Sequence, residues 1–344
     1  MMKRISILVI GFMMYTAVWS QKYYITNQYV YDLFLVNPAA AGIQKDCYQV
    51  NGSYQKQWFG IEEAPTTQII SVQGPVTSNL GLGMYAFNDR NGYYGEMGFQ
   101  MALSYEVQLL NKQNTVSSLT FGLAFSGEQS VLDGTMFSDE TLLDPAISGG
   151  RDSGWGMNAS SGFLWKHNHY QLGVVVTNLL PQVNTLYLNE GEPERVMDFH
   201  FHLGTTYKLS DREIYLSPLL MYRRNAAADS RLDFNLKSHF PTANPHVSLW
   251  GVAAYRRNMD HQFGKSIGAA MTAGIQYKQF SMGLEYQLGL TSVRKEYGNA
   301  YQLVFGYRFC KSQTKKSIPC SEIHFKKRKS ASRIVKKMIA EEMN

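Results

Sequence analysis

Large apolar residues alternate with small or polar residues along most of this chain, and this pattern limits the fold more than any other feature. In one segment, Met282, Leu284 and Tyr286 alternate with Gly283 and Glu285. A period of two places successive side chains on opposite faces of a β-strand. The sequence therefore predicts an all-β protein whose sheet has one large apolar face and one small or polar face.

The length of the alternating runs indicates where the apolar face lies. The runs are about ten residues long, which exceeds an ordinary soluble strand and suits a tilted strand that crosses a membrane. Tyr and Phe lie near the ends of the apolar face, as in an interfacial aromatic girdle. A soluble β-sandwich would also alternate, but only a closed barrel leaves no unsatisfied strand edge in lipid. We predict a single antiparallel transmembrane β-barrel.

The composition agrees with a barrel and excludes a bundle of membrane helices. Charged residues make up 17% of the chain and aromatic residues 13%, and there are 29 glycines. The mean hydropathy of −0.25 is too low for a polytopic helical membrane protein. The polar face carries charges that a water-filled lumen would accept, at Lys208, Asp233, Lys237, Glu285 and Arg308.

Fourteen strands are expected within a barrel over residues 47–309. An even number of strands places both termini on one side, which for an exported barrel is the periplasm. The predicted strands are residues 47–58, 65–75, 79–88, 95–110, 115–128, 153–167, 169–178, 195–209, 212–225, 228–240, 245–257, 265–278, 280–291 and 299–309.

The N-terminus has the pattern of a secretory signal peptide. Lys3 and Arg4 precede an apolar run that ends at Ser20, and this run is short for a spanning helix. We expect cleavage after residues 1–20, and a transmembrane anchor is the alternative. Residues 21–46 would then form a periplasmic lead-in to the barrel or a plug inside it.

The three cysteines permit one disulfide in an exported protein. Cys310 and Cys320 are the candidate pair, which would leave Cys47 unpaired. Their spacing does not resemble a zinc site.

The positive net charge of +6 belongs to the ends of the chain. Residues 311–344 hold ten Lys and Arg against three Asp and Glu, so residues 21–310 carry −3 and give no support for nucleic-acid binding. The basic tail, residues 310–344, is expected in the periplasm, with a possible helix over 330–342. It is either a solvated tail or a segment that folds onto a periplasmic partner or an anionic surface. Its docking candidates are Lys326, Lys327, Arg328 and Lys329.

Candidate catalytic and metal sites are weak. His246 and Ser248 share one strand face, as His and Ser do in outer-membrane phospholipases, but they fall at the periplasmic start of a strand. His200 and His202 are too few for a metal site and are expected to line the lumen. We predict no enzyme, no cofactor and no metal centre.

Several short motifs, taken in order, resemble the PorP/SprF family. They cover approximately residues 27–309 and include Asn27-Gln28-Tyr29, Asn37-Pro38-Ala39 with Gly42, Gln57-Trp58, Ala64-Pro65-Thr66, Leu80-Gly81-Leu82-Gly83, Asn88-Asp89 with Gly92, Leu119-Thr120-Phe121-Gly122, Asn178-Leu179, Gly204 to Tyr207, Pro218 and Tyr255-Arg256. Pro38 holds Asn37 extended, Trp58 is expected at the outer rim, and Asn91-Gly92 is expected to form a hairpin turn.

The resemblance implies a non-enzymatic outer-membrane component of the type IX secretion system. Members of the family support export of surface proteins, and several serve gliding motility. The implied partners are outer-membrane lipid, periplasmic secretion components and cargo C-terminal domains. A passive porin is the main alternative, and an outer-membrane lipase acting through Ser248 is a weaker one. The motif residues that are candidates for partner docking are Asn37, Pro38, Ala39, Gly42, Gln57, Trp58, Pro65, Thr66, Asp89 and Gly92.

Overall fold

A computed structural model gives the architecture of most of the barrel. It describes residues 28–45, 47–58, 60, 63–112, 115–136, 150–180, 186, 196–209, 214–226, 230–259, 266–289 and 299–310. The predicted signal peptide, Cys320 and the tail candidates Lys326 to Lys329 lie outside these residues. In the described part of the chain, no helix has the length and apolar character needed to cross a membrane.

The strands follow the predicted segments closely. They are β1 (Cys47–Lys56), β2 (Thr66–Pro75), β3 (Leu80–Asn91), β4 (Tyr94–Lys112), β5 (Thr115–Asp133), β6 (Arg151–His167), β7 (Tyr170–Thr177), β8 (Asp198–Thr205), β9 (Tyr207–Leu209), β10 (Ile214–Asn225), β11 (Ser230–Pro241), β12 (Val247–Asn258), β13 (Ser266–Tyr277), β14 (Phe280–Gly289) and β15 (Ala300–Cys310). Four short 3-10 helices are η1 (Gln28–Val30), η2 (Leu33–Leu35), η3 (Pro38–Ala40) and η4 (Gly134–Met136).

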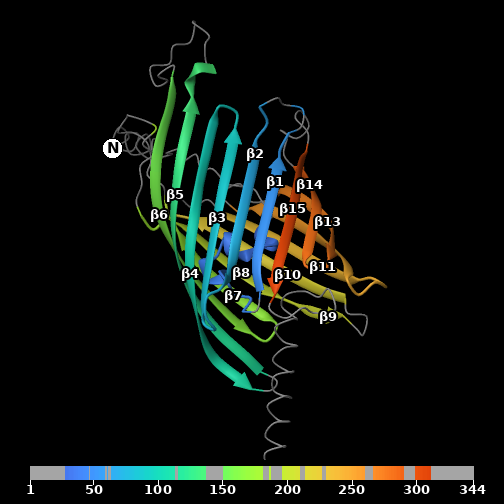
Figure 1. Cartoon of the computed structure of the whole chain (residues 1–344). Coiled ribbons are helices and arrows are strands. Elements are labelled where there is room, and N and C mark those ends of the chain that lie inside the picture. Colours follow the sequence, from blue (N-terminus) through green and yellow to red (C-terminus); the bar gives the residue numbers. More distant parts are fainter. Residues whose placement is uncertain are drawn as a thin grey trace, which may run out of the picture.

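These strands form one closed antiparallel sheet (Figure 1). Apart from β8 and β9, each strand pairs with its neighbour in sequence, and β1 pairs with β15, so the sheet has no open side. β8 and β9 are separated by Thr206 alone and pair with the same strand, β10. The fifteen labelled strands therefore occupy fourteen positions around the wall, which confirms the predicted barrel and its strand number.

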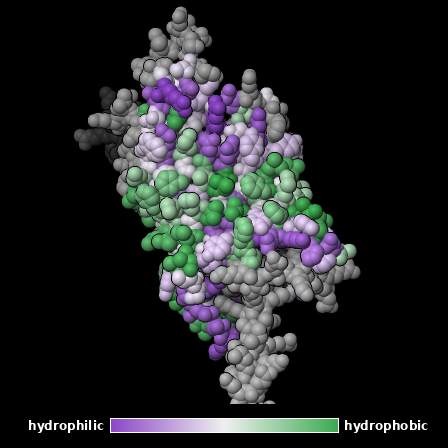
Figure 2. All heavy atoms as spheres, in the orientation of Figure 1, coloured by the Kyte–Doolittle hydropathy of each residue, from purple (hydrophilic) through white to green (hydrophobic). Residues whose placement is uncertain are grey.

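The two faces of the sheet divide as the alternation predicts. In β5, Phe121 and Leu123 are exposed on the outer face, while Thr120 and Ala124 are buried on the inner face. Figure 2 shows apolar residues gathered in a band across the middle of the visible outer surface, with hydrophilic residues above and below it. A barrel that spans a membrane has such an apolar outer band, because its outward-facing side chains contact the hydrocarbon core of the bilayer.

The two ends of the barrel differ in their connections. One end, here called the turn end, holds the start of β1, the end of β15 and connections of two to five residues. Most connections at the opposite end, here called the loop end, are longer, including the one between β5 and β6. Short turns on one side and longer loops on the other are typical of outer-membrane barrels.

The disulfide differs from the predicted pairing. Cys47 is bonded to Cys310, not Cys320 to Cys310, and the bond joins residues 263 apart in sequence. Closure of the barrel makes Cys47 and Cys310 register partners at the first position of β1 and the last of β15. Sequence spacing alone favoured the short loop because the seam between β1 and β15 forms only when the sheet closes.

Candidate functional site

Residues 28–45, here called the inner segment, lie inside the barrel (Figure 1). Their local structure follows from two capping residues. Asp32 accepts a hydrogen bond from the backbone N–H of Phe34 and caps η2. Asn37 accepts one from the backbone N–H of Ala39 and caps η3, with Pro38 at its first position. Asp and Asn are favoured at such caps, and Pro is favoured directly after them.

Asp32 fixes the inner segment to β1 and β2. Besides the bond from the backbone of its own turn, its carboxylate accepts hydrogen bonds from Asn51 (3.0 Å), Ser71 (2.5 Å) and Gln73 (2.6 Å). Burial raises the pKa of the Asp32 carboxyl, and these four hydrogen bonds act in the opposite direction. A buried acceptor with four donors is costly to replace, because a substitute leaves several of the donors without a partner.

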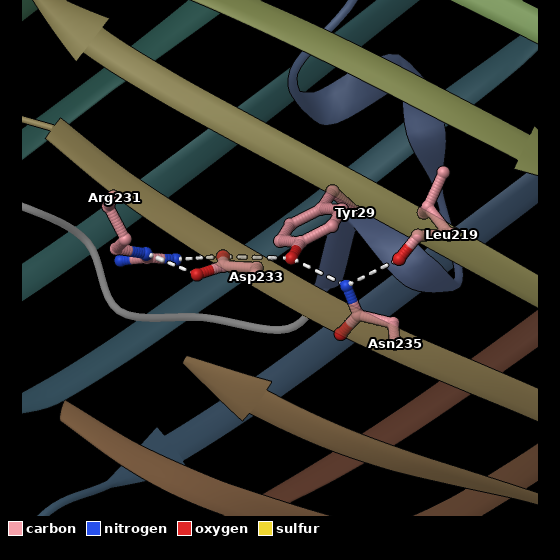
Figure 3. A network of polar contacts seen from close by, with 5 residues as sticks. All are labelled: Tyr29, Leu219, Arg231, Asp233 and Asn235. Carbon is pink, nitrogen blue, oxygen red and sulfur yellow. Dashed lines mark hydrogen bonds and ion pairs between the residues drawn. The ribbon is translucent and has the colours of Figure 1, made fainter. Parts of the chain in front are cut away.

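Tyr29 bonds to the opposite wall. Its hydroxyl donates to Asp233 Oδ2 (2.9 Å) and accepts from Asn235 Nδ2 (2.9 Å), both on β11. Arg231 donates to both oxygens of Asp233, so the carboxylate is paired as well as hydrogen-bonded. Asn235 Nδ2 also lies within hydrogen-bond reach of the Leu219 carbonyl on β10 (Figure 3).

Tyr31 reaches a third part of the wall. Its hydroxyl donates to Glu285 Oε2 on β14 (3.2 Å) and lies 2.5 Å from Thr272 Oγ1 on β13. Its ring packs edge-on against Trp250 of β12, with 5.3 Å between the ring centroids. Lys237 Nζ lies 5.7 Å from the Tyr31 ring centroid and 5.8 Å from that of Trp250. Burial raises the pKa of the Tyr31 hydroxyl, which keeps it a proton donor.

The part of the inner segment around Asn37 forms hydrogen bonds with β4, β6 and β8. Asn37 Nδ2 donates to the Phe163 carbonyl of β6 (3.2 Å) and lies 2.9 Å from His202 Nε2 of β8. Ser104 of β4 donates to the Ala41 carbonyl (2.6 Å). The inner segment thus forms hydrogen bonds to strands on all sides of the lumen, and its position does not depend on one part of the barrel wall alone.

Inward-facing glycines in the wall make room for this close packing. A Cβ on Gly122 of β5 would lie 2.2 Å from the Ala39 nitrogen, and one on Gly81 of β3 would lie 2.2 Å from the Ala41 carbonyl oxygen. A Cβ on Gly83 would meet the Phe34 ring at 2.7 Å. Carbon atoms normally approach to about 3.5–4.0 Å, so any side chain at these positions would displace the inner segment.

A cavity of about 390 Å³ lies between the inner segment and the turn end. Its lining includes Asp32 and Tyr31 of the inner segment and Asn168 and His169 of the β6–β7 turn. We call this cavity the vestibule. Within the described residues, no three His, Cys, Asp or Glu side chains form a group suited to a metal ion.

The motif residues predicted for docking fall into two separate groups. Asn37, Pro38 and Ala39 are buried in the lumen, and the Gly42 N–H donates to Gln73 Oε1 (3.0 Å) with a φ of +61°. The other group lies at the loop end of β1, β2 and β3.

In that second group, the Gln57 N–H donates to the Pro65 carbonyl (2.9 Å) directly before Thr66 opens β2. Trp58 follows β1 with a φ of +50°. Thr67 donates to Asp89 Oδ1. Gly92, with a φ of +61°, and Tyr93 form the two-residue connection between β3 and β4. The two groups are therefore not parts of one surface.

The residues considered for catalysis are distributed differently. Ser248 is fully buried on the inner face of β12, whereas His246 is exposed in the preceding turn. His200 and His202 both face inward from β8, as predicted for lumen-lining residues. Of the charges assigned to the inner face, Asp233 and Glu285 are buried, Lys237 and Arg308 line the vestibule, and Lys208 is exposed at the turn end.

The polar contacts of Asp32, Tyr29 and Tyr31 are the main features that the sequence reasoning missed. One signal was present: Asp32 is the single charged residue in the run from Tyr29 to Val36, which is otherwise apolar. A buried carboxylate needs donors, so Asp32 indicated that the segment packs against a polar surface. Which residues supply the donors depends on strands far away in sequence.

Comparisons with known proteins give one family match and several similarities to solved structures. A family model described as type IX secretion system membrane protein PorP/SprF matches residues 18–307. No curated protein matches the chain. Among solved structures, the chain is similar to the toluene transporter TodX of Pseudomonas putida, with 11% identity over 85% of this chain and 95% of that chain and a TM-score of 0.43.

Two further solved structures show the same kind of similarity. The toluene transporter TbuX of Ralstonia pickettii has 11% identity over 83% of this chain and 94% of that chain, with a TM-score of 0.44. CdiB from Acinetobacter baumannii has 9% identity over 77% of this chain, with a TM-score of 0.41, and the chain spans 60% of its length.

Proposed function

Because the chain belongs to the PorP/SprF family of type IX secretion system membrane proteins, we propose that it acts as a non-enzymatic barrel of the outer membrane. In this role it supports the export or anchoring of surface proteins. We include gliding motility among the processes that such an exporter serves.

The inner segment is the observation that carries this proposal. It occupies the lumen and bonds to β1 and β2 through Asp32, to β11 through Tyr29 and to β6 through Asn37. A passive porin needs a lumen that water and solutes cross, whereas a barrel that holds a segment of its own chain offers a fixed internal support. These contacts favour a docking component of the secretion machinery over an open channel.

The proposed orientation places the turn end in the periplasm. Short connections gather there, as they do on the periplasmic side of bacterial outer-membrane barrels. The Cys47–Cys310 disulfide also lies at that end and suits an oxidising compartment. In this orientation residues 1–20 are a cleaved signal peptide, residues 21–46 enter the barrel from the periplasm, and residues 310–344 form a periplasmic tail.

The proposed partners are periplasmic type IX secretion components and the C-terminal domains of exported cargo. The test is affinity purification from the native membrane followed by mass spectrometry, with the barrel lacking residues 311–344 as a second bait. Secretion components should co-purify with the full chain. Unchanged recovery with the shortened bait would remove the tail from the proposal and leave the barrel.

A deletion strain and planar bilayers separate this function from a porin. Loss of surface proteins in the strain, together with no steady conductance from the purified barrel, is the expected result. Steady open channels together with normal secretion would overturn the proposal in favour of the porin.

A further inference from the structure

Above the closed ring of strands, one edge of β6 is open at the loop end. β6 pairs with β5 along its whole length, from Arg151 to His167, whereas its pairing with β7 starts only at Ser161. Figure 1 shows the upper ends of β5 and β6 rising above the rest of the wall. Within the described residues, residues 151–157 of β6 therefore have a neighbouring strand on one side only. We call this stretch the open edge.

The strand register shows which backbone groups face the open edge. At the upper end of the β5–β6 ladder, the Gly134 N–H donates to the Gly150 carbonyl, so the even-numbered residues of β6 bond to β5. Since neighbouring residues of a strand direct their N–H and C=O groups to opposite sides, the odd-numbered residues face away from β5. Ser153, Trp155 and Met157 therefore direct both backbone groups into the open edge. Within the described residues, no hydrogen bond reaches these groups there.

The chain itself leaves this edge just below residue 157. The Leu179 N–H makes the last main-chain bond to β6, donating to the Ala159 carbonyl (3.0 Å). Leu180 bonds instead to the side-chain amide of Asn158, which is buried on the inner face. Asn178, with a left-handed φ of +56°, ends the regular strand directly before this point. In the described part of the chain, β7 is therefore followed by a turn toward the lumen and not by a continuation along β6.

The outer face of the open edge is apolar and unusually exposed. Trp155 is 66% exposed and Met157 65%, whereas Phe163 and Trp165, lower on the same face of β6, are half-buried beside β7. Side chains at such alternate positions pack against those of an added strand. Unpaired backbone groups are not tolerated in hydrocarbon, so the open edge belongs at the polar rim, and Trp155 indeed lies opposite Gln129 of β5.

A second copy of the chain is a poor occupant of the open edge. Two barrels in one membrane are related by an axis along the membrane normal, so both β6 strands would descend from the loop end. With strand tilts of about 35–45°, the two edges would cross at about 70–90°. Main-chain pairing requires strands that run side by side about 4.7–4.9 Å apart. An extended segment of a different protein is free of this constraint.

We propose that the open edge is a strand-addition site for an extended segment of another protein at the loop end. The N–H and C=O groups of Ser153, Trp155 and Met157 bind the backbone of that segment. Apolar side chains at alternate positions of the segment pack on Trp155 and Met157, which gives the site its selectivity. The inference rests on the proposed function only for the expectation that this protein is one that the barrel exports or anchors.

The probe is a fluorescein-labelled octapeptide of alternating valine and threonine with a lysine at each end, added to the purified full-length chain in detergent. Residue-resolved hydrogen exchange should show slower exchange at the amides of Ser153, Trp155 and Met157. The amides of Gly154 and Gly156, which face β5, should not change. The matched control peptide carries the same side chains but is methylated on the backbone nitrogens of its six central residues, so it cannot pair as a strand.

Two substitutions test the edge by anisotropy of the labelled peptide. Ser153→Pro removes one edge-facing N–H without touching the bonds to β5, and it should weaken binding by about threefold to tenfold. Ser153→Ala keeps that N–H and should bind as the wild-type chain does.

Trp155→Ala should weaken binding by about twofold to fivefold. Met271→Ala should not, because Met271 is equally exposed but lies on β13, which has a partner strand on both sides. Heat-modifiable gel mobility shows which variants fold, and the comparison of the two peptides on the wild-type chain needs no variant.

Three results would overturn the inference. Equal binding of the methylated peptide would show adsorption to the apolar surface without strand pairing, and unchanged binding by a folded Ser153→Pro variant would show that the edge is not used. Protection of Ser153, Trp155 and Met157 before any peptide is added would show that another part of the chain already covers them. If a deletion strain secretes normally, the proposed function fails, and the exchange measurement still decides whether the edge accepts a strand.

Discussion

Replacing Gly122 by alanine should release the inner segment while leaving the barrel folded. The added Cβ would lie 2.2 Å from the Ala39 nitrogen and 2.3 Å from the Pro38 carbonyl carbon. Both are backbone atoms, so no rotation of a side chain relieves the overlap. Compared with a normal contact of about 3.5–4.0 Å, η3 has to move by more than about 1 Å.

That movement has an energetic cost set by the bonds that hold η3. Asn37 is bonded both to Ala39 and to the wall at Phe163, so a shift of the backbone strains two hydrogen bonds at once. Overpacking of this kind costs about 1–3 kcal/mol. The ratio of released to docked inner segment should therefore rise by a factor of about 5–150.

Hydrogen exchange measured by mass spectrometry reads this ratio directly. Exchange of backbone amides in residues 28–45 should accelerate by the same factor, because local opening limits it. The matched control is Gly95→Ala in β4, where the nearest atom to the added Cβ is the Asp89 carbonyl oxygen at 3.7 Å. Equal exchange in both variants, with both barrels showing normal heat-modifiable mobility, would refute the packing argument.

Three other changes test the same arrangement from different sides. Asp32→Asn should destabilise docking by about 1–3 kcal/mol, because in either orientation the amide NH₂ faces two donors, and faster exchange in residues 28–45 would measure it. Cys47→Ser should lower the temperature at which the heat-modifiable band disappears, with a loss of about 2–5 kcal/mol, while Cys320→Ser should not; the reverse ranking would contradict the Cys47–Cys310 bond. Deleting residues 28–45 should turn a silent barrel into one that conducts in planar bilayers, and continued silence would show that other residues close the lumen.

The barrel wall was predictable because its signal is local. In a strand with one face in lipid and one face toward the lumen, apolar residues have to alternate with small or polar ones. This alternation is visible within single segments, such as Met282 to Leu290 and Phe121 to Phe125, without reference to any other part of the chain. The predicted strand limits agree with β1 to β15 within a few residues. Within the described residues, the break at Thr206, which divides one predicted strand into β8 and β9, was not predicted. The Thr206 N–H donates to the carbonyl of His169 in the neighbouring β6–β7 turn.

The internal contacts were not predictable because they depend on closure. The register that places Cys47 beside Cys310 exists only after fourteen strands have formed a ring. The same is true of the side-chain donors to Asp32, which come from β1 and β2, and of the partners of Tyr29 on β11. No periodicity in residues 28–45 indicates which wall residues they will meet, since the segment consists of short 3-10 turns.

The inner segment and the wall glycines give a physical reason for motifs that seemed unrelated in sequence. The stretch from Asn37 to Gly42 and the glycines of β3, β5 and β6 are one packing unit, in which small residues on both sides let two backbones approach. Packing inside the lumen is therefore a sufficient physical reason for these residue types, and a role of Asn37 to Gly42 in partner docking stays a prediction.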